Sequence, residues 1–85
     1  MNYLYVLYSA DNDSEKFYIG STSDLKKRLR DHNAGQNHST AGKNWRLVYY
    51  EAYVTLSAAR DRERKLKKHG RTKQLLLKRV RKSFE

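Results

Sequence analysis

The chain has 85 residues, and its 19 lysines and arginines outnumber nine acidic residues to give a net charge of +10. This length predicts one domain over residues 1–85, with a thin core that buries about 60% of the unfolded surface. The composition excludes disulfide bridges and a disulfide-linked partner, because cysteine is absent, and a membrane-spanning helix, because no stretch approaches the roughly 18 apolar residues required.

The chain begins with a pattern typical of a β-hairpin. Residues 2–9, NYLYVLYS, are β-branched and aromatic and are apolar on both alternating faces, which predicts a strand covered on both sides. A polar turn at 10–15 leads to a second strand at 16–21, KFYIGS. The first apolar run is short, tyrosine-rich and not preceded by a basic residue. We therefore expect no signal peptide and, with cysteine absent, a cytoplasmic protein.

A helix follows the second strand and is expected to end near Gly35. Thr22 or Ser23 is the expected N-cap, with Asp24 in the first turn, where a negative charge favours the helix. Gly35 suits the left-handed conformation that commonly ends a helix.

This first helix carries two ionisable residues where apolar ones are expected. At about 100° per residue, Arg28 and His32 fall on the same arc as Leu25 and Leu29. Other basic residues of the helix, such as Lys26, fall on the opposite arc. We therefore expect Arg28 and His32 to point toward the core.

The remaining elements are, in chain order, a polar loop at 36–44 that includes His38, a strand at 45–54, a helix at 56–69 and a helix at 73–84. Thr55 is expected to cap the first of these helices, Gly70 to end it and Thr72 to begin the next. The order β-β-α-β-α-α indicates an α+β fold, with a small three-stranded antiparallel sheet flanked by helices.

The helix at 56–69 places one carboxylate, that of Glu63, on its inward arc among residues that are otherwise mostly basic. Two structural interpretations are open. Glu63 could form a partly buried ion pair with Arg28, or pair along its own helix with Arg60 or Lys67. A third is functional, because converging ionisable groups often mark sites.

The positive charge is concentrated toward the C-terminus. Twelve lysines and arginines lie between Arg60 and Lys82, against two acidic residues. Such a surface attracts nucleic acid, or it is simply a solvated helical face. A membrane surface is less favoured, because the helices lack aromatic anchors opposite the charge.

The strands use tyrosine where phenylalanine would serve a purely apolar core. There are seven tyrosines and two phenylalanines, and a buried tyrosine hydroxyl needs a hydrogen-bond partner. Most of the tyrosines are explained as half-buried residues of a sheet. Tyr5 and Tyr18 are singled out because they lie on the paired strands that precede the helix with Arg28.

These features together resemble the GIY-YIG nuclease family. YIG at residues 18–20 matches the second motif, Arg28 follows ten residues after its tyrosine, and His32 one turn later. Glu63 matches the family's glutamate on the next helix, and YLY at residues 3–5 stands in the first motif. The sequence departs from the family pattern in having a tyrosine for the first glycine and no asparagine beyond the glutamate helix.

The resemblance implies a metal-dependent endonuclease that hydrolyses phosphodiester bonds in DNA. Glu63 would hold Mg²⁺ or Mn²⁺, and Arg28 would clamp a non-bridging phosphate oxygen. Tyr5 would act as the base for a water molecule or hold it, with His32 sharing that role or orienting Tyr5. Tyr18 would position the phosphate or the water. Such nucleases serve repair, restriction and homing.

The expected nucleic-acid contacts are basic residues on the three helices: Lys26, Arg30, Lys67, Lys68, Arg71 and Lys73. The expected partner is DNA, bound mainly through its phosphates and with little sequence specificity. Two alternatives involve no catalysis. One is a nucleic-acid-binding module that keeps the fold, and the other is a basic protein–protein adaptor.

Overall fold

The computed structural model describes residues 1–11, 14–35 and 43–85. The elements in chain order are β1 (Asn2–Asp11), β2 (Ser14–Thr22), α1 (Leu25–Asn33), β3 (Arg46–Tyr53), α2 (Leu56–Lys68) and α3 (Gly70–Phe84). The strands form one antiparallel sheet in the order β2-β1-β3. The predicted α+β fold and its element order are confirmed. Most of the predicted polar loop, with His38, lies outside the described residues.

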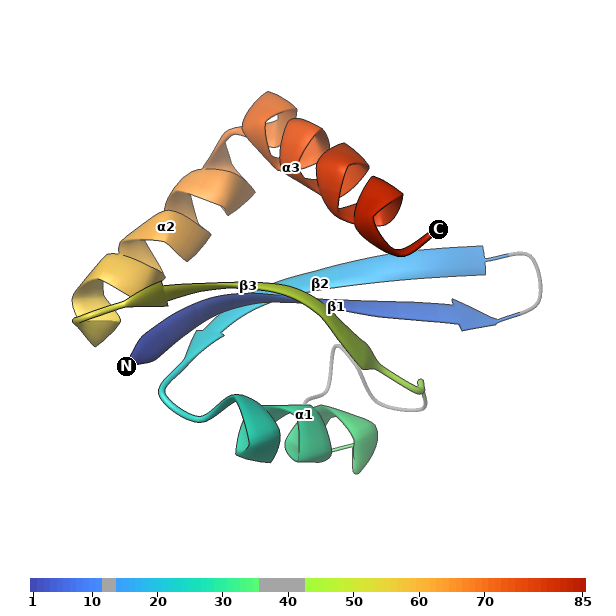
Figure 1. Cartoon of the computed structure of the whole chain (residues 1–85), viewed down its shortest axis with the longest axis horizontal. Helices are drawn as coiled ribbons and strands as arrows, with labels where there is room; N and C mark the ends of the chain where they lie inside the picture. The colour runs from blue at the N-terminus through green and yellow to red at the C-terminus, as the bar shows by residue number, and fades with distance from the viewer. Residues whose placement is uncertain (12–13, 36–42) are drawn as a thin grey trace.

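The sheet separates two helical layers. Figure 1 shows α1 on one face and α2 and α3 on the other. The apolar core is accordingly in two parts. The part under α2 and α3 consists of Leu4, Val6, Ile19, Leu66, Leu76 and Val80, and the part under α1 is centred on Tyr5, Leu7 and Trp45. The central strand β1 supplies both parts, as its two-sided apolar pattern predicted.

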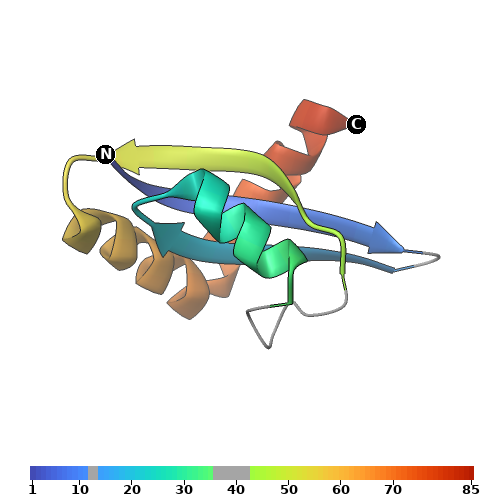
Figure 2. The same cartoon turned by 90° about the horizontal axis from the view of Figure 1, so that it is seen from below.

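The strand register places the two tyrosine motifs side by side. Tyr5 of β1 lies opposite Gly20 of β2 and opposite Tyr50 of β3. Residues two apart on a strand share a face. Tyr18 and Gly20 are therefore on the face of β2 that α1 covers, and the Ser21 side chain is on the opposite face, toward α2. Figure 2 shows α1 lying diagonally across this face, with α2 emerging behind the sheet beyond β2.

The start of α1 differs from the prediction, and its end agrees with it. Asp24 is the N-cap, and its side chain accepts a hydrogen bond from the backbone N–H of Lys27 at 3.1 Å. Thr22 is still part of β2, and its hydroxyl accepts from the backbone N–H of Asp24. The Thr22 hydroxyl therefore stabilises the turn between β2 and α1 and does not cap the helix. Gly35 has a φ of 78°, which confirms the predicted left-handed position.

The junction between α2 and α3 is tighter than predicted. Thr55 caps α2 as expected, accepting from the backbone N–H of Ala58 at 3.1 Å. However, α2 ends at Lys68, and Gly70 begins α3 instead of ending α2, so the predicted start at Thr72 is wrong. The extended backbone of His69 makes the turn between the helices, and its carbonyl accepts the first helical bond of α3.

None of the helices in the described ranges is both long and apolar enough to cross a membrane.

Candidate functional site

A buried hydrogen bond between Tyr5 and His32 lies at the centre of the site. The Tyr5 hydroxyl oxygen is 2.9 Å from His32 Nε2, and the two residues are 2% and 0% exposed. The bond joins the central strand to α1. It confirms the prediction that His32 faces the core.

Gly20 allows this arrangement by leaving space over β2. A Cβ built at Gly20 would lie 2.5 Å from the Tyr5 hydroxyl oxygen. The Tyr5 ring therefore leans against the bare backbone of the neighbouring strand. This close approach gives the glycine of the Tyr-Ile-Gly motif a steric reason in this chain.

Tyr18 completes a cluster of three rings under α1. Its ring centroid is 4.7 Å from that of His32 and 6.3 Å from that of Tyr5. The predicted catalytic residues Tyr5, Tyr18 and His32 are therefore in contact, although they come from three elements.

The surroundings of this cluster set its protonation. Burial raises the pKa of Tyr5 well above its usual range, Tyr18 adds to that, and the nearby charge of Arg28 only partly opposes it. Burial, together with Arg28, lowers the pKa of His32 below its ordinary value. At neutral pH the pair therefore consists of a protonated tyrosine and a neutral histidine.

Arg28 is exposed, so the prediction that it points into the core is wrong. Its angular position is farther from the centre of the apolar arc than that of His32, and a long side chain there can extend to solvent. Its guanidinium nevertheless acts on the pKa of both Tyr5 and His32. Arg28 is thus exposed but near enough to the ring cluster to influence it electrostatically.

Glu63 is held at the edge of the sheet by two hydrogen bonds. Its Oε1 accepts from the Ser21 hydroxyl at 2.6 Å, and its Oε2 accepts from Lys67 Nζ at 2.7 Å. Its side chain is 23% exposed. Of the two structural interpretations, the pair along α2 is the one formed. No ion pair with Arg28 occurs in the part of the chain that the structure describes.

The site extends around an edge strand. Glu63 meets β2 from the α2 side, and Tyr18 projects from β2 toward α1. Lys67 lies between Glu63 and Tyr18, because its Nζ pairs with the Glu63 carboxylate and is 5.7 Å from the centroid of the Tyr18 ring. A ligand bound along the outer edge of β2 could therefore contact Tyr18 and the carboxylate together.

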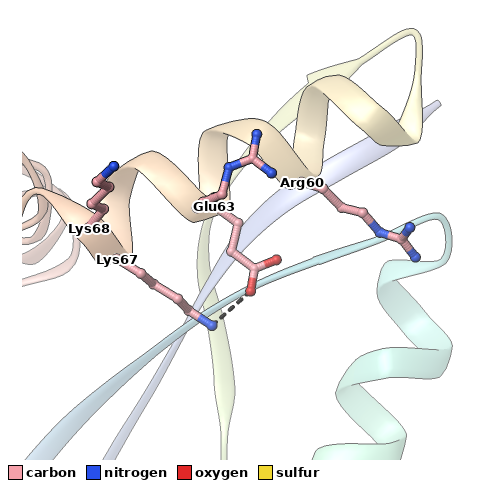
Figure 3. A pocket seen from close by; sticks show the side chains of 5 residues that line it. Arg60, Glu63, Lys67 and Lys68 are labelled. Carbon is pink, nitrogen blue, oxygen red and sulfur yellow. Dashed lines mark hydrogen bonds and ion pairs between the residues drawn. The ribbon is translucent and has the colours of Figure 1, made fainter.

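A basic groove of about 520 Å³ surrounds the carboxylate, and it is lined by Arg60, Glu63, Arg64, Lys67 and Lys68. Figure 3 shows the carboxylate of Glu63 facing the ammonium of Lys67 in this groove. Lys67 and Lys68 were predicted as nucleic-acid contacts. Arg60 and Arg64 were not, although their spacing from Lys67 places them on one stripe of α2.

The other predicted contacts do not line this groove. Lys26 and Arg30 are exposed on α1, and Arg71 and Lys73 lie in the first turn of α3. Ser21 was also missed by sequence reasoning. Its role depends on which face of β2 meets α2, and a lone serine in a strand does not indicate that.

The residues present fit a divalent cation held by one carboxylate. Within the described ranges there is no group of three or more histidine, aspartate or glutamate side chains that could enclose a metal. Mg²⁺ suits such a site, because it keeps several waters and takes one or two carboxylates together with substrate phosphates. Each oxygen of Glu63 retains acceptor capacity beyond its present partner.

The fold and the ionisable side chains described above define a small α+β domain whose candidate site lies at the edge of its sheet. The sequence matches the GIY-YIG catalytic domain over residues 1–76. The chain therefore belongs to the GIY-YIG family.

Its relatives include small proteins named UPF0213 protein. One from Haloquadratum walsbyi is 37% identical over 75 residues, covering 86% of this chain and 84% of the relative. One from Clostridium perfringens is 35% identical over 79 residues, covering 91% and 82%. One from Streptococcus pyogenes serotype M5 is 40% identical over 76 residues, covering 87% and 79%. No solved structure matches significantly.

Proposed function

We propose that the chain is a metal-dependent endonuclease that hydrolyses phosphodiester bonds in DNA, with little sequence specificity of its own. The observation that carries this proposal is the buried bond between Tyr5 and His32, which lies within the electrostatic influence of the exposed Arg28 and across β2 from Glu63. Several kinds of partner would satisfy a buried tyrosine hydroxyl, and a neutral histidine is one that can also accept a proton.

The pair can move a proton without forming a free phenolate. A water that attacks phosphorus would pass a proton to the Tyr5 oxygen while Tyr5 passes its own proton to His32 Nε2. The new bond joins the water oxygen to phosphorus, the bond from phosphorus to the leaving oxygen breaks, and the leaving oxygen takes a proton from solvent. This step requires the histidine tautomer with Nε2 unprotonated, and the lowered pKa of His32 keeps the ring neutral and able to accept.

The remaining residues bind and neutralise the phosphate. Arg28 clamps a non-bridging oxygen with two parallel N–H donors, and Tyr18 positions the phosphate or the water beside Tyr5. Glu63 would hold Mg²⁺ or Mn²⁺, and the ion would supply charge neutralisation for the reacting phosphate.

The groove on α2 would bind the nucleic-acid backbone. Its four cations contact phosphates, and the exposed cations of α1 and α3 add long-range attraction. Phosphate contacts carry no sequence information, which is the basis for expecting little specificity. We place the activity in the cytoplasm, with DNA repair as a process it would serve.

A cleavage panel tests the proposal. Linear, flapped, branched and single-stranded DNA and the matching RNA are incubated with Mg²⁺, Mn²⁺ or EDTA. We expect cleavage of at least one DNA that EDTA abolishes. The Glu63→Gln variant should stay folded and lose the activity, because glutamine can still accept from Ser21 but is a poor ligand for Mg²⁺.

A non-catalytic binding module is the second candidate. The ion pair between Lys67 and Glu63 favours it, since the carboxylate is already neutralised within the protein. This candidate predicts salt-sensitive binding of DNA without cleavage of any substrate in the panel. Metal-dependent cleavage lost in Glu63→Gln excludes it.

A further inference from the structure

We propose that Lys67 and a divalent cation are alternative partners of Glu63, so that nucleic acid opens the metal site by drawing Lys67 away. The proposal rests on the proposed metal-binding role of Glu63. It assigns Lys67 a function beyond general attraction, as the positioning residue that couples phosphate binding to metal binding.

The first step is the contact itself. Lys67 Nζ is 2.7 Å from Glu63 Oε2, at the i and i+4 spacing that brings side chains together on a helix. The Ser21 hydroxyl donates a hydrogen bond to the other carboxylate oxygen, Glu63 Oε1. A cation that approaches Glu63 in the free protein therefore competes with an ammonium already in place.

The second step is the charge around the carboxylate. Four cations and one carboxylate line the groove. A divalent ion would enter a region that is positive before it arrives, which disfavours binding in the absence of nucleic acid. A phosphodiester bound in the groove brings the negative charge that the metal needs.

The third step is the freedom of Lys67 to move. Its side chain is 49% exposed, and its Nζ already lies 5.7 Å from the Tyr18 ring centroid, on the way to the ring cluster. A phosphate beside Tyr18 would offer the ammonium a new anionic partner at little cost. Lys67 would then leave Glu63 and bind the phosphate.

Coupling of this kind is reciprocal. If phosphate increases the affinity of the site for metal, metal increases the affinity for phosphate by the same factor. Removing the Lys67 ammonium should remove the competition, so that the free protein binds metal more tightly.

The chain offers a matched control for this test. Lys68 lines the same groove and carries the same charge, but it makes no ion pair within the described residues. We would measure binding of Mn²⁺ to the full chain, without nucleic acid, from the free-ion signal in electron paramagnetic resonance. The proteins compared are the wild type, Lys67→Met, Lys68→Met and Glu63→Gln.

Lys67→Met should bind Mn²⁺ at least about fivefold more tightly than the wild type. Lys68→Met should improve binding much less, and Glu63→Gln should bind more weakly than the wild type. Equal effects of the two lysine variants would overturn the proposal, because general charge would then explain both. No change in Lys67→Met would overturn it as well.

The transfer of Lys67 is observable separately by nuclear magnetic resonance of the lysine ammonium groups. A short duplex is titrated in EDTA, and the Lys67 signal is assigned by its absence from Lys67→Met. We expect this signal to shift as the duplex binds. A shift of the Lys68 signal with that of Lys67 unchanged would contradict the transfer.

The outcomes separate this inference from the proposed function. Tighter Mn²⁺ binding by Lys67→Met, with no cleavage of any substrate, would keep the exchange and reject the nuclease. Metal-dependent cleavage by the wild type, with equal Mn²⁺ affinities for the two lysine variants, would support the nuclease and reject the exchange.

Discussion

The contact between Gly20 and Tyr5 is sensitive to a single methyl group. We expect Gly20→Ala to destabilise the protein by about 1–3 kcal/mol, because its Cβ would overlap the buried hydroxyl and ring of Tyr5. Denaturant unfolding measures the change. Gly70→Ala is the matched control, since a Cβ there meets nothing within 4 Å. Equal stability of both variants would mean that the Tyr5 ring is not fixed against β2.

The buried histidine predicts how stability depends on pH. The pKa of His32 is lowered in the folded state, so below the ordinary value near 6.5 the unfolded chain binds a proton that the folded chain resists. Stability from this source is complete above about pH 6.5 and falls as the pH decreases toward the folded-state pKa. Unfolding free energies between pH 5 and 7 should therefore rise with pH.

The variant His32→Gln should lose most of this slope, whereas His69→Gln should keep it. His69 is exposed at the junction of α2 and α3, outside the ring cluster. A slope that persists unchanged in His32→Gln would assign the dependence to another group.

Arg28 is predicted to affect turnover and not folding. Its side chain is exposed, so Arg28→Ala should change stability by less than about 0.5 kcal/mol. Cleavage should fall by about 10²–10³-fold, as for other preorganised charge stabilisers, while DNA affinity stays within a few-fold. Arg28→Lys should not restore the rate, because an ammonium lacks the guanidinium fork. Parallel losses of affinity and rate would make Arg28 an ordinary phosphate contact.

At the scale of elements, a network on β3 holds the helix that carries Glu63. The Glu51 carboxylate accepts hydrogen bonds at 2.6 Å from both Tyr49 and Tyr53, and it accepts two from Arg62 of α2. Burial acts to raise the pKa of Glu51, but these hydrogen bonds outweigh it and hold the pKa below its ordinary value. The network fixes α2 against β3.

Glu51→Gln should cost about 1.5–3 kcal/mol, because it removes the charge-assisted bonds to Arg62 in a partly buried setting. Glu15→Gln, in β2, provides a comparison for the attachment of α3. Glu15 also binds an arginine, Arg81, but that pair is more exposed, and its loss should cost about 0–1 kcal/mol. Thermal unfolding of both variants measures the difference. A larger loss in Glu15→Gln would place the main anchor at α3 instead.

The sequence predicted the elements well and their junctions less well, for a physical reason. Apolar periodicity is a local signal, and it identified all three strands and helices. The residue that caps α1 depends on where β2 stops pairing, and the turn at His69 depends on how α2 and α3 meet the sheet. The local sequence pattern indicates neither the end of β2 nor the packing of α2 and α3, so the roles predicted for Thr22 and Gly70 were wrong.

The same distinction applies to the site. The spacing of His32 from Leu25 and Leu29 was enough to predict that it faces the core. Arg28 lies near the boundary of the apolar arc, and there the coverage by neighbouring elements decides exposure. Ser21 joins the site only because α2 crosses the edge of β2, which the spacing of residues along either element does not indicate.

At the scale of the whole molecule, charge and shape combine on the edge of β2. The chain has a net charge of +10, but only some of its cations line the groove beside Glu63. If the groove is the binding surface, cations in it should contribute more to nucleic-acid affinity than equal cations elsewhere.

The salt dependence of DNA binding tests that expectation. Affinity should fall steeply with salt, with a slope in log–log form of about −0.9 for each phosphate neutralised. Replacing Arg60 and Lys68 by alanine should reduce the slope by up to about two such units and weaken all sequences alike. The control replaces Lys78 and Lys82, which are exposed on α3 and outside the groove, and it changes the net charge equally. Fluorescence anisotropy at several salt concentrations measures both. Equal slopes for the two double variants would show that the total charge, and not the groove, determines binding.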